Sequence, residues 1–413
     1  MNAIALIILF TIFFDLILHG IADYLNLKML RSDLPKAFQS VYDPDGYRKS
    51  QQYLRVNTRF GWIISGFNVI VLLLFWFGRG FPMLDQWVRS FSFGQLISGL
   101  IYMAVLMLLR ALISLPFSIY ATFVIEERFG FNKTTGSTFI ADILKGLLLA
   151  VLLGTPLLAG ILAFFEYAGA NAWWLCWIVV TLYMLGVQFI APTWIMPLFN
   201  KFSTLESGTL RSAILAYAKS IKFPLRNVYV MDGSRRSKKS NAFFTGFGKH
   251  KRIVLFDTLI KQHSVSELIT ILAHEMGHYK KKHILQTIVL GILQMGIMLY
   301  LLSLFISYQG LFDAFYMPQK SVYAGLIFFA MLYSPLDFFM GIFMQSRSRK
   351  NETEADRFSA ETTGDPQSMI AALKKLSVHN LSNLLPHPLY VFLNYSHPPV
   401  LQRIKTLEAG SAR

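Results

Sequence analysis

The chain has 413 residues, 54% of them hydrophobic and 15% aromatic, and its mean hydropathy is +0.46. This composition is too apolar for an ordinary soluble domain, and the apolar residues form long blocks, which indicates a membrane protein. The net charge of +16 gathers in particular loops without a finger motif or an aromatic–basic repeat. We therefore attribute the positive charge to the orientation of the chain in the membrane and to contacts with lipid headgroups, and we expect no nucleic-acid partner. The single cysteine, Cys176, excludes an intramolecular disulfide and a cysteine-based zinc site.

Seven apolar runs are each long enough to cross about 30 Å of hydrocarbon as a helix. The N-terminus lacks a basic segment and a cleavage site, so we expect the first run to be retained as a span. The fourth run contains Pro156, and a tilt or a kink can accommodate it there. The runs lie near residues 3–22, 61–79, 96–118, 139–166, 173–197, 284–307 and 322–345.

The loops between these runs alternate in charge. The loop near 23–60, the region 198–283 and the chain after 345 are rich in lysine and arginine, whereas 167–172 and 308–321 are almost free of both. The positive-inside rule then predicts an external N-terminus, seven crossings and a cytosolic C-terminus. The expected divisions are spans one to five at 1–197, a cytosolic insert at 198–283, spans six and seven at 284–345, and a cytosolic C-terminal region at 346–413.

Several charged or titratable residues interrupt the spans. Charges are costly in a bilayer, so we expect these residues to face a polar interior, although a residue such as Lys145 can instead extend its amine to the membrane surface. They are Asp15, His19, Arg110, Lys145 and Asp337.

The insert shows the pattern of a small α+β unit. We expect an amphipathic helix at Thr209–Ile221 and short strands at Asn227–Met231 and Arg252–Asp257. A helix should follow over Ser264–His278, because Ser264 is a good N-cap and Glu267 stands three residues after it. Three lysines then precede His283 and the sixth span, and we interpret them as a membrane-boundary anchor without a catalytic part.

The most informative motif lies at the end of that helix. His274, Glu275 and His278 form His-Glu-x-x-His, in which the two histidines are about one helical turn apart and share a face. Two imidazoles so placed can hold one Zn²⁺ and leave room for a third protein ligand and a water. Glu275 is placed to take a proton from that water, which is the chemistry of amide hydrolysis.

The third ligand has to come from elsewhere in the chain. Glu352 and Asp356 stand four residues apart after the seventh apolar run, again on one helical face. In one interpretation Glu352 binds zinc and Asp356 accepts a hydrogen bond from a zinc-bound histidine. In the other, Glu352, Glu354 and Asp356 form a solvated helix face, and spacing alone leaves both open.

A histidine and an arginine near the C-terminus complete the set of candidates. A side chain that donates a hydrogen bond near zinc can stabilise the oxyanion of amide hydrolysis, and His397 or Arg403 has the right chemistry. The residue pattern by itself favours an ordinary loop histidine at position 397.

The chain resembles the integral-membrane CAAX prenyl proteases, which are type I CAAX endopeptidases of the gluzincin metalloprotease class. The resemblance rests on segments that occur in the same order along nearly the whole chain. They are 126–133, 197–202, 241–243, 252–257, 274–278, 348–356, 386–390 and 395–403.

This resemblance implies a fold and a set of roles. It implies an all-α integral-membrane barrel of seven tilted helices around a water-filled chamber, with a small cytosolic α+β metalloprotease insert. It implies zinc as the cofactor, with His274, His278 and Glu352 as its ligands. It also implies that the tripeptide at the C-terminus of a prenylated peptide or protein is the substrate.

The remaining roles come from matching positions. Glu275 matches the general base and Asp356 the partner of a zinc ligand. Asn241, Ala242 and Phe243 match the edge that pairs with the substrate backbone, over 241–247. His397 and Arg403 match residues that act on the substrate or the oxyanion, which reverses the residue-based preference for His397.

The sequence also bears on the membrane in which the protein lies. The tail, ending in Gly410-Ser411-Ala412-Arg413, has no retrieval signal, and the loops are compact. Both features favour a bacterial inner membrane over the endoplasmic reticulum, with membrane lipid as a partner.

A transporter or channel with a regulatory metal site is the alternative function, but the chain shows no inverted repeat. An intramembrane-cleaving protease would carry the zinc motif inside a span, whereas here three lysines follow it.

Overall fold

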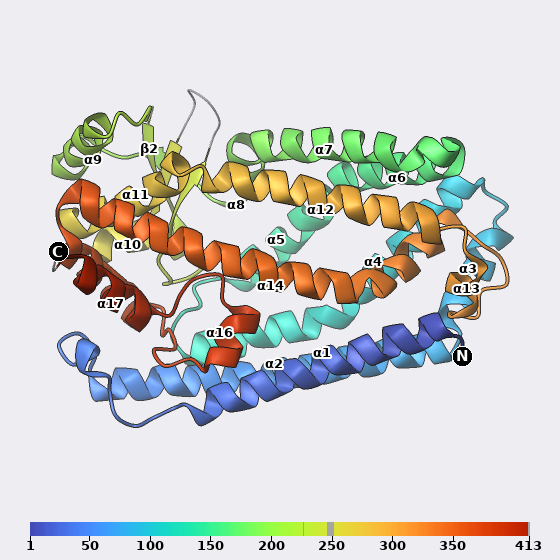
Figure 1. The fold of residues 1–413 in the computed structure, drawn as a ribbon, viewed down its shortest axis with the longest axis horizontal. Coiled ribbons are helices and arrows are strands. Elements are labelled where there is room, and N and C mark those ends of the chain that lie inside the picture. The colour runs from blue at the N-terminus through green and yellow to red at the C-terminus, as the bar shows by residue number, and fades with distance from the viewer. Residues whose placement is uncertain (226, 246–251, 412–413) are drawn as a thin grey trace.

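The computed structural model describes residues 1–225, 227–245 and 252–411 (Figure 1). Within them the chain is mostly helical, and seven helices are long and apolar enough to cross a membrane. The seven predicted spans are therefore confirmed in number and order. They are Ala3–Lys28 (α1), Pro44–Phe77 (α2), Gln95–Glu126 (α4 and η2), Gly136–Tyr167 (α5, η3 and α6), Ala172–Phe199 (α7, η5 and α8), His283–Phe305 (α12) and Val322–Thr363 (α14).

The surface of these helices is that of a membrane protein. In the most apolar window of each helix only 6% to 17% of the residues are buried by protein. Many of the other apolar side chains, such as Phe10, Leu74 and Phe339, are exposed on the helix surfaces. Because so much apolar surface is unfavourable in water, a lipid bilayer must cover it.

Two of the spans are much longer than predicted. The helix α2 begins at Pro44, with Asp43 as its N-cap, so much of the region predicted as the loop 23–60 is helical. The helix α14 has 42 residues and continues without a break from the seventh apolar run to Thr363. Glu352 and Asp356 therefore lie on the extension of a span rather than on a separate helix. Apolar content marks only the part of a helix that meets lipid, which is why hydropathy missed both extensions.

The fourth span is interrupted where the sequence contains proline. It consists of α5 (Gly136–Leu149), a π-helical turn η3 (Ala150–Gly154) and α6 (Thr155–Tyr167). Pro156 has no backbone N–H with which to continue the α-helical ladder, so the preceding turn widens. The predicted tilt or kink at Pro156 stays a prediction, and the structure adds a π-helical turn directly before α6.

Several charges within the spans have polar partners. The imidazole of His19 lies 3.4 Å from the carboxylate of Asp15. Lys145 donates to the carbonyl of Leu198 at 2.7 Å, and Asp337 accepts from Gln294 at 3.2 Å. These contacts reduce the cost of a charge at membrane depth.

The α+β insert forms as predicted, with two additional strands. The predicted strands are β2 (Asn227–Met231) and β4 (Arg252–Phe256), and they pair in parallel. The strand β1 (Phe202–Thr204) adds antiparallel to β2, and β3 (Ala242–Thr245) adds antiparallel to β4. The order β1-β2-β4-β3 leaves β3 at an edge. The amphipathic helix is α9 (Thr209–Ser220), and α10 (Asp257–Gln262) follows β4.

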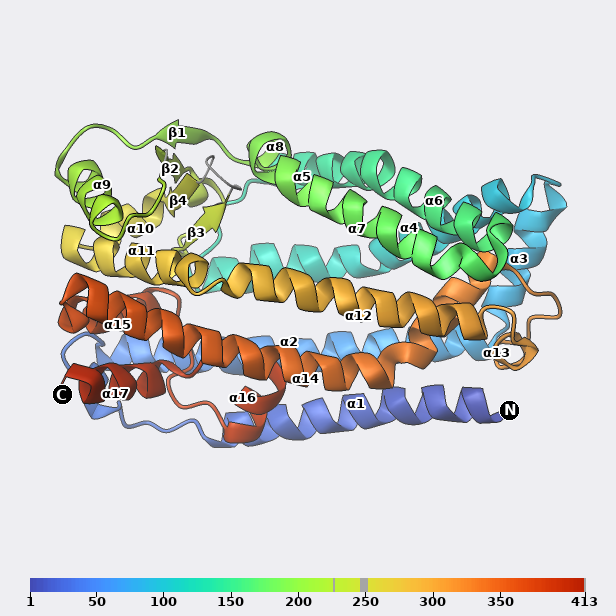
Figure 2. The same cartoon turned by 45° about the horizontal axis from the view of Figure 1, so that its top comes forward.

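The insert and the C-terminal helices α15 (Pro366–His379) and α17 (Val400–Ser411) gather at one end of the molecule, and the N-terminus lies at the other (Figures 1 and 2). Between α15 and α17 in the chain lies α16 (Pro388–Asn394). The shorter elements elsewhere are η1 (Lys36–Phe38), α3 (Gly80–Ser90), η4 (Gly169–Asn171), η6 (Gly233–Arg235) and α13 (Gln309–Asp313).

Candidate metal centre

The helix α11 (Val265–Lys280) carries the His-Glu-x-x-His motif. Its N-terminus has the predicted capping box, in which the Ser264 hydroxyl accepts from the Glu267 N–H and the Glu267 carboxylate accepts from the Ser264 N–H. This arrangement satisfies two N–H groups that a helix start otherwise leaves unpaired. The start of the helix, and therefore the orientation of its histidine face, is fixed locally.

The helices α11 and α14 approach closely beside this motif. A Cβ atom added at Gly277 would lie 3.0 Å from the Phe358 ring of α14, tighter than side chains normally tolerate. The Ser359 hydroxyl also donates to the Thr270 carbonyl at 2.7 Å, inside the protein. Glycine inside the motif therefore allows α14 to bring a carboxylate to the histidines.

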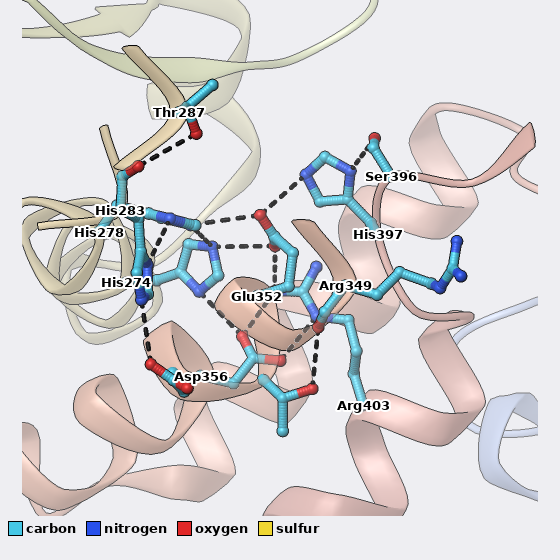
Figure 3. Close-up of polar contacts among 12 residues, drawn as sticks. His274, His278, His283, Thr287, Arg349, Glu352, Asp356, Ser396, His397 and Arg403 are labelled. Atoms are coloured by element: carbon cyan, nitrogen blue, oxygen red, sulfur yellow. Dashed lines mark hydrogen bonds and ion pairs between the residues drawn. The ribbon is translucent and has the colours of Figure 1, made fainter. Parts of the chain in front are cut away.

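Three donor atoms meet where the helices cross (Figure 3). His274 Nε2 and His278 Nε2 are 3.2 Å apart, and the Glu352 oxygens lie 3.3 Å from the first and 3.2 Å from the second. A tetrahedral zinc site with bonds of about 2.0–2.1 Å has donor atoms roughly 3.3–3.4 Å apart. The buried Glu352 Oε2 also has no hydrogen-bond partner among the described residues. The spacing and the chemistry of the three donors fit a metal ion.

The surroundings of His274 favour a positive charge. Its Nδ1 lies 2.9 Å from Asp356, which receives two hydrogen bonds from Arg403, at 2.6 and 2.7 Å. Burial lowers the pKa of His274, but Asp356 and Glu352 more than reverse this and raise it to about 9. Asp356 thus lies where the partner of a ligand histidine was predicted, and the guanidinium of Arg403 is engaged with that carboxylate.

Glu275 is half-buried and directly follows the ligand candidate His274 on α11. Burial raises the pKa of its carboxyl above the ordinary value, although the charges of His274 and His278 oppose the shift. A carboxylate with a raised pKa accepts a proton from water more readily near neutral pH.

His397 is also brought to this centre. Its Nε2 lies 3.3 Å from Glu352 Oε1, its Nδ1 lies 2.9 Å from the Ser396 hydroxyl, and its side chain is 59% exposed. Desolvation lowers the pKa of this imidazole, although Glu352 opposes the shift. The residue pattern alone, which favoured an ordinary loop histidine, did not predict this contact between His397 and Glu352.

Sequence reasoning missed Arg349, which holds the loop that carries His397. Its guanidinium donates to the Tyr395 carbonyl at 2.6 Å and to the Val391 carbonyl at 3.3 Å. Arg349 is three residues before Glu352 on α14, so the two project from neighbouring positions on the helix. That spacing was the available signal, but it does not reveal the distant carbonyls.

The predicted substrate edge begins at Asn241 and continues as β3. Asn241 accepts from the Phe256 N–H at 3.1 Å, and Ala242 and Phe243 pair with β4. The ring of Phe244 lies 5.9 Å from that of Tyr279 in α11, which ties this edge strand to the metal helix. Residues 246–247 of the predicted edge lie outside the described residues.

Known proteins match the chain over its length. Residues 23–201 match the family described as CAAX prenyl protease N-terminal, five membrane helices, and residues 204–411 match peptidase family M48. The CAAX prenyl protease 1 homolog of Oryza sativa subsp. japonica is 34% identical and covers 97% of each chain. CAAX prenyl protease 1 of Saccharomyces cerevisiae is 32% identical over 94% of this chain and 91% of its own. A crystal structure of Ste24p from S. mikatae is similar with a TM-score of 0.93 and 30% identity, covering 99% of this chain and 100% of that one.

These likenesses decide between the functions considered above. The transporter or channel is not favoured, because the relatives matched over the full length are proteases. The relatives named here are eukaryotic, so they do not support the bacterial placement, which stays a prediction. The protein acts on a peptide or protein substrate through a metal. The chain belongs to peptidase family M48, as a multi-pass membrane metalloendopeptidase of the CAAX prenyl protease type.

Proposed function

We propose that the metal is zinc, that His274, His278 and Glu352 hold it, and that the enzyme removes the C-terminal tripeptide from prenylated or similarly lipidated peptides. The observation that carries this proposal is the triangle of donor atoms 3.2–3.3 Å apart, with Glu275 next to it on α11. Bound zinc would polarise the scissile carbonyl and lower the pKa of a water molecule.

Glu275 carries both proton transfers, and His397 stabilises the charge that develops on the substrate. The Glu275 carboxylate takes the proton of the attacking water and passes it to the leaving amine. His397, from the opposite side of Glu352, donates a hydrogen bond to the oxyanion that develops on the scissile carbonyl. Arg403 keeps Asp356 directed at His274, and its matched role toward the substrate stays a prediction.

The substrate backbone adds as a strand to β3. An edge strand has N–H and C=O groups that are free to pair with an extended peptide. Asn241, Ala242 and Phe243 are assigned this role because β3 is an edge of the sheet and is tied to α11 through Phe244 and Tyr279.

The direct test is cleavage by the purified protein of a farnesylated CAAX peptide and of the same peptide without the lipid. We expect mass spectrometry to detect release of the tripeptide from the farnesylated peptide, loss of activity on chelation and recovery with zinc. Equal cleavage of both peptides would contradict the lipid specificity. No cleavage of either one would contradict the proposed function.

The orientation of the active site gives a separate prediction. The alternation of lysine and arginine between the spans predicts that the metal centre lies on the cytosolic side. Reporter domains fused after residues 40, 170, 240, 315 and 405 should read cytosolic, external, cytosolic, external and cytosolic. An external reading after residue 240 would place the centre on the other side and contradict the topology.

A further inference from the structure

The second ring nitrogen of His278, Nδ1, contacts a row of side chains that have no part in the mechanism proposed above. His278 Nδ1 lies 3.2 Å from Nδ1 of His283 (Figure 3). His283 Nε2 lies 3.1 Å from a carboxylate oxygen of Glu354. The His283 side chain is 4% exposed and that of Glu354 is 42% exposed. The chain of contacts therefore runs from the buried donor triangle to the protein surface.

The direction of these hydrogen bonds follows from their two ends. A histidine that binds metal through Nε2 carries its proton on Nδ1, so His278 donates to His283. The Nδ1 of His283 is then an acceptor, which places the proton of the neutral ring on Nε2. An ionised carboxylate only accepts, so Glu354 receives that proton's hydrogen bond. Only this assignment satisfies every member of the chain while leaving His278 Nε2 free for a metal.

The backbone is bent to make this contact. The helix α11 ends at Lys280 and α12 begins at His283, and between them Lys282 has φ of +60°. A left-handed conformation is unfavourable in a non-glycine residue, so the surrounding structure must stabilise it. The turn brings the His283 ring to 5.2 Å from that of His278, where packing against α14 supplies Glu354.

We propose that His283 and Glu354 are positioning residues for the metal, an inference that rests on the proposed zinc site. They hold His278 in its Nδ1–H tautomer, fix its ring plane and increase the electron density at Nε2. His274 is held in the same way by Asp356 and Arg403. Each ligand histidine is thus linked to a carboxylate on α14. His274 contacts Asp356 directly, and His278 is linked to Glu354 through the imidazole of His283.

The test uses the full-length protein in detergent and measures how fast zinc is lost to a chelator, by elemental analysis. The variants are His283→Phe, which keeps a ring without hydrogen bonds, Glu354→Ala, and Glu354→Gln, which retains an acceptor oxygen. Glu361→Ala is the matched control, since it removes an exposed carboxylate from the same helix. We expect zinc affinity to fall about 10–100-fold in the first two variants, less in Glu354→Gln, and not in the control.

Thermal unfolding of the metal-free proteins separates positioning from a structural role. Positioning predicts that metal-free His283→Phe and Glu354→Ala unfold near the wild-type temperature, whereas a structural role would lower that temperature and leave zinc release unchanged. If His283→Phe does not fold, Glu354→Ala at the half-exposed end of the chain still decides. Zinc release at the wild-type rate from Glu354→Ala would overturn the inference. A wild-type protein that binds zinc but cleaves no peptide would instead overturn the proposed function.

Discussion

Replacement of Glu275 by glutamine should reduce peptide cleavage by at least ~10²-fold, the usual contribution of a general base. The amide has nearly the same shape as the carboxylate but cannot accept the proton of the attacking water. The three proposed metal ligands are untouched by this change. Steady-state cleavage of the farnesylated peptide measures the loss.

Two further measurements make this result specific to chemistry. The zinc content of Glu275→Gln and its thermal unfolding in detergent should stay near wild type. Burial is the main cause that raises the pKa of the Glu275 carboxyl, and a neutral amide tolerates burial at least as well as a carboxylate does. Full cleavage activity in this variant would rule out Glu275 as the base. Loss of zinc together with activity would show that the residue supports the metal instead.

Replacement of Glu352 by alanine should remove the metal. The substitution leaves two imidazoles without the carboxylate that lies 3.2–3.3 Å from each, and two neutral donors hold zinc weakly. We expect zinc content well below one ion per chain, and a loss of affinity larger than the ~10–100-fold that an outer-shell partner contributes. Cleavage should fall in proportion to the zinc that remains.

The control for this variant is Glu361→Ala, an exposed carboxylate on the same helix α14, which should keep both zinc and activity. Glu354→Ala should fall between the two, because Glu354 acts on the metal only through His283 and His278. Full zinc occupancy in Glu352→Ala would show that the third ligand is another residue.

Much of the fold was predictable because its signals are local. A run of apolar residues marks a lipid-facing helix wherever it occurs, so the seven spans were found in number and order. The capping box at Ser264 and Glu267 and the strand β2 depend on neighbouring residues, and they form where the pattern indicated them. The pair His274 and His278 needs only one turn of helix to face one ion.

The tertiary structure decided everything that depends on how those elements meet. Spacing left the role of Glu352 open, and the close approach of α11 and α14 at Gly277 brings its carboxylate to the histidines.

The residues around the ligands were beyond the reach of a sequence pattern for the same reason. Arg349 binds carbonyls of another helix, Arg403 pairs with Asp356, and His283 reaches His278 only because the chain turns at Lys282. Periodicity and spacing report which residues share a face of one element. The distance between faces is set by packing and by backbone turns between distant segments, and these determine which side chains meet.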